Sequence, residues 1–172
     1  MSPKLDYFRA LGLSPSMALE RASLDRAFRE TSKRVHPDRF SREAPVQRKL
    51  ALAHTELVNQ AYKVLKDPRT RGEYLLMLSG QEVASETDRT EDPEFLMAML
   101  EKQEALENAS DDDTVAAFRA ETEARYQHLI GTLEAWFDEG EGSLEAAKRA
   151  LVELRYLRRM LEQIALKEEE LF

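Results

Sequence analysis

Apolar side chains recur every three to four residues along nearly the whole chain. The segment that carries Leu24, Phe28 and Val35 is one example, and no segment shows sustained alternation of apolar and polar residues. A spacing of three to four places apolar groups on one face of an α-helix, whereas a half-buried strand needs a period of two. The sequence therefore predicts an all-α protein.

The charge is divided unevenly between the two halves of this 172-residue chain, which is long enough for one domain or two small ones. Residues 1–80 contain 15 Lys and Arg against 9 Asp and Glu, a balance of +6, and residues 81–172 contain 10 against 24, a balance of −14. This difference favours two modules with different partners. The alternative is that the acidic helices serve only solubility.

Four helices are expected in residues 1–80. The first covers Tyr7–Leu11, the second ends at Pro37, the third ends before Pro68, and the fourth covers Arg71–Leu78. The second and third should form an antiparallel hairpin with a loop at its tip. The residues of the third helix expected to face inward are Leu50, Ala53, Leu57, Ala61, Val64 and Leu65.

Residues 81–92 are poor in apolar groups and are expected to form a linker. Three amphipathic helices should follow in residues 93–172. The first is expected to start at Asp92-Pro93, and the second follows three aspartates at 111–113. A turn at residues 140–143 separates the second from the third. Short connections between such helices predict an antiparallel three-helix bundle.

The absence of cysteine excludes disulfides, thiolate metal sites and cysteine nucleophiles. The three histidines, His36, His54 and His128, lack metal-ligand spacing, and there is no glycine-rich phosphate loop. No stretch approaches the roughly 18 apolar residues of a membrane span. We therefore expect a cytoplasmic protein that is not an enzyme, with no metal, cofactor, small-molecule substrate or membrane partner.

The tripeptide His36-Pro37-Asp38 falls in the loop predicted at the hairpin tip. In isolation it could be an ordinary helix-ending sequence. Its context is more specific, because residues 6–13 (DYFRALGL) precede it and residues 59–65 (NQAYKVL) with Asp67-Pro68-Arg69 follow it. Together these segments resemble the J-domain family over residues 5–79. The resemblance implies that the tripeptide docks on a DnaK-type chaperone and stimulates ATP hydrolysis by that partner.

J-domains also use basic residues of the second helix to meet an acidic partner surface. The residues that match this role here are Arg26, Arg29, Lys33 and Arg34, with Arg39 beyond the tripeptide. Asp25 and Glu30 interrupt the basic patch, which departs from strongly basic J-domains and suggests weaker or more selective docking. A solvated helix face is the alternative interpretation.

The second half lacks the glycine- and phenylalanine-rich stretch and the cysteine-rich module of general J-proteins. Residues 71–76 (RGEYLL) and 92–97 (DPEFLM), with Leu100-Glu101, instead resemble the HscB family, and this similarity spans essentially the full chain. The resemblance implies a co-chaperone of iron–sulfur cluster assembly. Its expected partners are an HscA-type chaperone and an IscU-type scaffold protein.

Helix geometry indicates where such a client would bind. Phe95, Met99 and Leu106 form one apolar stripe, and a second lies roughly 140° away. Val152, Tyr156 and Met160 are likewise expected on the far side of the last helix from its core. The predicted scaffold-binding residues are Leu96, Met97, Leu100 and Tyr156, with Glu101 and Glu104 as an acidic rim. Alternatively, these residues pack against the first module.

The sequence leaves two other functions to compare with this one. The basic first module could bind nucleic acid, but its aromatic residues fall mainly on inward faces and the acidic module would repel phosphate. We therefore expect no nucleic-acid partner. A J-protein that serves a different client shares every J-domain prediction and differs only at the second module.

Overall fold

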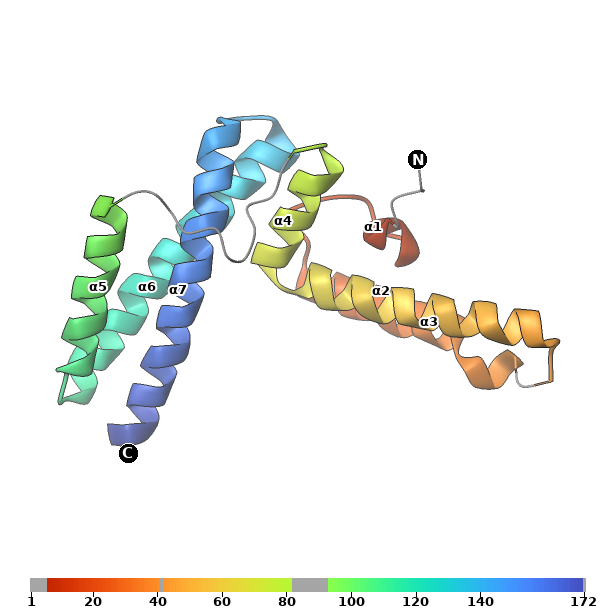
Figure 1. Ribbon diagram of the computed structural model, residues 1–172, viewed down its shortest axis with the longest axis horizontal. Helices are drawn as coiled ribbons and strands as arrows, with labels where there is room; N and C mark the ends of the chain where they lie inside the picture. Colours follow the sequence, from red (N-terminus) through yellow and green to blue (C-terminus); the bar gives the residue numbers. More distant parts are fainter. Residues whose placement is uncertain (1–5, 41, 82–92, 172) are drawn as a thin grey trace. The chain divides into compact units, whose positions relative to one another are not determined.

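The computed structural model describes residues 6–40, 42–81 and 93–171 (Figure 1). Within these ranges the regular structure is helical throughout, without a strand, which confirms the all-α fold. The chain divides into two compact units, Met1–Ser79 and Gly80–Phe172. Of the linker predicted at 81–92, residues 82–92 lie outside the described ranges. No helix in the described ranges combines the length and apolarity that crossing a bilayer requires.

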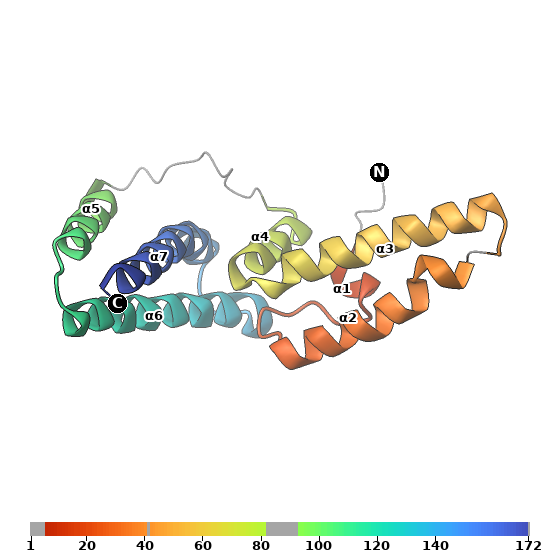
Figure 2. The same cartoon turned by 90° about the horizontal axis from the view of Figure 1, so that it is seen from below.

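The first unit is built around a long helical hairpin. Its elements are α1 (Tyr7–Ala10), α2 (Arg21–Val35), the 3-10 turn η1 (Pro37–Phe40), α3 (Pro45–Lys66) and α4 (Pro68–Leu78). Helices α2 and α3 lie side by side, as both Figure 1 and Figure 2 show. Phe8 of α1, Leu24 of α2 and Leu65 of α3 are fully buried in the core of this unit.

Polar and aromatic contacts join α2 to α3. The rings of Phe28 and Tyr62 stack with centroids 4.2 Å apart. The Tyr62 hydroxyl donates to the Asp25 carboxylate at 2.8 Å, and Arg21 donates to the same carboxylate at 2.8 Å. These two donors, Arg21 first, lower the pKa of Asp25. Asp25 therefore forms hydrogen bonds within the hairpin that join α2 to α3.

The inward face of α3 differs from the predicted one. Leu50 and Ala53, expected inside, are exposed, and the residues that are buried are Ala51, Val58, Ala61 and Leu65. The prediction was right for Ala61 and Leu65 and wrong for Leu50 and Ala53, because α3 carries apolar residues around more than half of its circumference. At 100° per residue, the buried set is centred about 70° from the predicted stripe.

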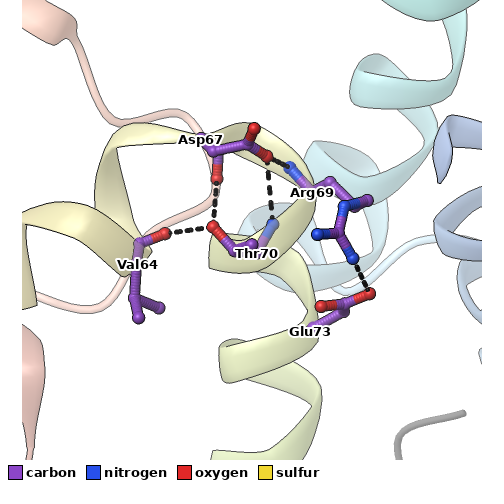
Figure 3. Close-up of polar contacts among 5 residues, drawn as sticks. All are labelled: Val64, Asp67, Arg69, Thr70 and Glu73. Carbon is purple, nitrogen blue, oxygen red and sulfur yellow. Dashed lines mark hydrogen bonds and ion pairs between the residues drawn. The ribbon is translucent and has the colours of Figure 1, made fainter. Parts of the chain in front are cut away.

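Helix α4 begins at Pro68, three residues before the predicted start, because Asp67 caps it (Figure 3). The Asp67 carboxylate accepts from the backbone N–H groups of Arg69 at 2.9 Å and Thr70 at 3.2 Å. The Thr70 hydroxyl donates to the carbonyl of Val64 at 2.6 Å, which ties the new helix to the end of α3. Arg69 in the first turn and Glu73 in the second form an ion pair at 2.6 Å.

The cap of α4 gives a stability prediction. Asp67→Ala leaves two backbone donors without their acceptor, and the loss of such a cap costs about 1 kcal/mol. Amide hydrogen exchange in α4, followed by mass spectrometry on the full chain, should become about fivefold faster if that free energy controls local opening. Asp67→Asn keeps the acceptor and should retain protection. Equal exchange in the alanine variant and the wild type would show that the cap is dispensable.

The second unit is a three-helix bundle. Its elements are α5 (Pro93–Glu107), α6 (Asp112–Glu134), the π-helical turn η2 (Ala135–Glu139) and α7 (Leu144–Leu171). Helices α6 and α7 lie side by side, and α5 packs against α7 (Figures 1 and 2). Its fully buried side chains include Val115, Leu133, Leu154 and Ile164. Asp92, predicted to cap α5, lies outside the described residues.

Ion pairs reinforce the bundle on its outer surface. Arg119 of α6 donates to Glu168 of α7 at 2.7 Å, and Arg125 donates to Glu153 at 2.7 and 2.8 Å. The hydrogen bonds from Arg119 lower the pKa of the Glu168 carboxyl. Lys102 of α5 reaches Glu121 of α6 at 2.6 Å. These pairs connect α5 to α6 and α6 to α7.

Candidate functional site

The tripeptide lies at the exposed tip of the hairpin. His36 follows α2, and Pro37 and Asp38 begin η1, so the segment forms one turn of 3-10 helix where a loop was expected. His36 Nδ1 accepts from the backbone N–H of Asp38 at 3.3 Å, which holds the turn. The side chain of Asp38 is 90% exposed. A carboxylate in that position can meet a partner's cation.

The predicted basic residues of this unit are exposed along α2 and at the tip. Arg39 donates to the carbonyl of Lys33 at 3.4 Å, and Arg34 donates to the Thr31 hydroxyl at 3.0 Å. These contacts hold two guanidinium groups close to the surface of α2. The carboxylate of Asp25, which interrupts the patch in the sequence, is bonded to Arg21 and Tyr62. Of the two acidic residues that interrupt the basic patch in the sequence, Glu30 is therefore the one that is exposed.

The predicted client residues on α5 are mostly exposed. Met97 is 58% exposed and Leu100 is 56% exposed, whereas Leu96 is half-buried. Glu101 and Glu104 are exposed on the same helix. The α5 patch, defined as Leu96, Met97, Leu100, Glu101 and Glu104, therefore combines apolar and acidic groups on one accessible helix.

Val152, Tyr156 and Met160 of α7 were expected on the side of the helix away from the core. The structure corrects this expectation, because none of the three is exposed. Met160 is buried with Leu106 and Ile164 in the core between α5 and α7. Tyr156 is half-buried, and its ring packs edge to face on Phe95 with centroids 5.2 Å apart. The face of α7 opposite its contact with α6 is covered because α5 needs an apolar surface on which to pack.

Phe95 contributes to the position of the α5 patch, although the apolar spacing of the sequence assigned it only to the stripe with Met99 and Leu106. Phe95 directly precedes Leu96 in the sequence. Its contact with Tyr156 supports the amino-terminal half of α5. The far half of α5 is anchored by buried Leu106. Phe95 thereby helps to orient the α5 patch, and an aromatic residue directly before the exposed stripe was the only sequence signal for that role.

The remaining histidines lie apart from these sites. His54 and His128 are exposed on α3 and α6. In residues 6–40, 42–81 and 93–171, no three His, Asp or Glu side chains converge as metal ligands would. Neither of these two histidines belongs to the hairpin tip or to the α5 patch.

Two family models match separate parts of the chain. The model described as "DnaJ domain" matches residues 6–74, and the model described as "HSCB C-terminal oligomerisation domain" matches residues 91–165. The first match contains the tripeptide and its basic helix. The second contains the α5 patch and Tyr156.

Relatives and solved structures match over nearly the whole chain. A co-chaperone protein HscB homolog from Vibrio vulnificus is 36% identical and covers 98% of this chain and 99% of its own length. The mouse iron–sulfur cluster co-chaperone protein HscB is 32% identical over 95% of this chain and 69% of its own.

The structures of HscB from Vibrio cholerae and of the human co-chaperone HscB superpose with TM-scores of 0.84 and 0.85, each at 30% identity. The Vibrio cholerae match covers 97% of this chain and 99% of that one, and the human match covers 98% and 84%. Both units are included in these matches. With its J-domain tip and its acidic three-helix bundle, this chain belongs to the HscB family of co-chaperones.

Proposed function

We propose that this protein stimulates the ATPase of an HscA-type member of the DnaK class and delivers an IscU-type scaffold protein to it. The observation that carries the proposal is the exposed Asp38 carboxylate at a preorganised tip flanked by basic residues. Membership in the HscB family supports the role in iron–sulfur cluster assembly. We further propose that the protein acts in the cytoplasm, where ATP is available to its partner.

The tip would act by binding and would carry out no bond chemistry. Asp38 accepts a charge-assisted hydrogen bond from an arginine of the ATPase. Pro37 fixes the backbone and His36 holds the turn, so little conformational entropy is lost on docking. Arg26, Arg29 and Lys33 then attract an acidic surface of the partner and increase the association rate. The hydrolytic groups belong to the chaperone.

The α5 patch would hold the client. Met97 and Leu100 supply apolar area that becomes buried on binding, and Glu101 and Glu104 supply orientation. Tyr156 contributes the edge of its ring while it supports Phe95. A client that fits has an apolar site with basic groups around it.

An ATPase assay with two chaperones tests the proposal. Steady-state hydrolysis by an HscA-type and by a general DnaK-type chaperone is measured with this protein, with the scaffold protein, and with both. We expect more-than-additive stimulation of the HscA-type chaperone when both are present, because the chain then couples docking to client delivery. Stimulation without any effect of the scaffold would instead indicate a J-protein with a different client.

A further inference from the structure

The first two turns of α3 bury almost nothing. Every residue from Arg42 to Leu50 is exposed, although the segment includes Val46 at 71% and Leu50 at 54%. The helix start is nevertheless ordered, because Pro45 occupies its first position and the Gln47 side chain accepts from the Ala44 backbone N–H at 3.0 Å. Two large apolar side chains are thus held in water by a well-formed helix.

These side chains belong to a stripe that the hairpin leaves partly uncovered. At 100° per residue, Val46, Leu50, Ala53 and Leu57 lie within an arc of about 60°. The buried residues of α3 are centred about 90° away. Leu57 is half-buried, whereas Val46 and Leu50 are exposed. The stripe therefore opens to solvent at the amino-terminal end of α3.

That end of α3 adjoins the tripeptide. Helix α3 contacts η1, and Figure 2 shows η1 beside the first turns of α3 at the same end of the hairpin. Residues 33–50 contain six Lys and Arg against two acidic residues, a net charge of +4. The exposed apolar pair therefore lies in a basic segment, which joins the basic residues of α2 through the tip.

We infer that Val46 and Leu50 form an apolar anchor that extends the chaperone-docking surface across the tip onto α3. The occupant is an acidic surface of the DnaK-type ATPase that carries an apolar depression. Charge supports this choice over the same surface of a second copy of the chain, because two surfaces of +4 repel each other. The inference rests on the proposed function and adds a second contact region to it.

The variant that tests the inference is Val46→Gln with Leu50→Gln. Both positions are exposed, so the substitutions remove apolar area without opening the core. Because burial of two aliphatic side chains is lost, the concentration of protein that gives half-maximal ATPase stimulation should rise about tenfold or more. Maximal stimulation should be unchanged, since Asp38 is intact.

Leu52→Gln provides the matched control. Leu52 is 58% exposed on the same helix and lies about 160° around it from Leu50. This variant should behave as wild type. Equal half-maximal concentrations for all three proteins would overturn the inference alone, whereas absence of stimulation by the wild type would overturn the proposed function with it.

Sedimentation of the same proteins decides whether a second copy is the occupant. We expect one sedimentation coefficient for the wild type and for the Val46→Gln, Leu50→Gln variant at all concentrations. A wild-type dimer that this variant dissociates, with ATPase stimulation unaltered, would show a self-interface and overturn the inference.

Discussion

The Asp38→Asn variant is expected to abolish stimulation of the partner ATPase while the protein keeps its fold. The carboxylate is 90% exposed, and His36 Nδ1 lies 3.6 Å from it, so the fold loses little when the charge is removed. Docking loses a charge-assisted hydrogen bond, which is worth about 1.5–3 kcal/mol. Because the signal passes through this contact, we expect the loss in stimulation to exceed the loss in affinity.

The measurement is steady-state ATPase activity over a range of variant concentrations, with circular dichroism to verify the helices. Glu43→Gln is the matched control, since it also removes one exposed negative charge near the tip. We expect Glu43→Gln to stimulate at least as well as the wild type, because it makes the surface more basic. Full stimulation by Asp38→Asn would refute the assignment of the tripeptide as the docking element.

The second large effect is expected at the α5 patch. Replacing Leu96, Met97 and Leu100 together with alanine removes most of its apolar area. Loss of that burial should weaken the affinity for the scaffold protein by about a hundredfold or more. ATPase stimulation without scaffold should be preserved, because the tip is unchanged. Isothermal titration calorimetry with the scaffold protein measures the first effect, and the ATPase assay measures the second.

Leu166→Ala is a control for nonspecific loss of apolar surface in the same unit. Leu166 is 62% exposed on α7 and is not part of the α5 patch. Its variant should bind the scaffold as the wild type does. Since Leu96 is half-buried, thermal unfolding of the triple variant must be followed as well. Simultaneous loss of scaffold binding and of basal stimulation would indicate that the three residues support the fold and not a client.

Local signals in the sequence were sufficient to predict the helices. Pro37 ends α2, as its residue type predicted, and Gly80, which has a positive φ, follows α4. The predicted start of α4, Arg71, was three residues too late. The prediction treated Asp67 only as part of the J-domain resemblance, although its side chain caps the helix. The tripeptide was placed correctly at the hairpin tip, although its 3-10 conformation was not predicted.

The faces of the helices were predicted less well. Leu50 was expected inside and is exposed, whereas Met160 was expected on the far side of α7 and is buried. Both helices carry apolar residues on more than one face, and periodicity does not indicate which of two apolar stripes a neighbouring helix will cover. Met97 and Leu100, on a helix with polar groups around them, were expected to be accessible, and both are exposed.

The order and type of the elements follow from the sequence alone, because apolar spacing, prolines and capping side chains act within a few residues of each other. The exposure of Val46 and Leu50, the burial of Met160 and the support of Tyr156 by Phe95 were decided only by tertiary structure. These features depend on which helices pack together and at which angle. That choice minimises exposed apolar area over a whole unit, and no single segment contains the information.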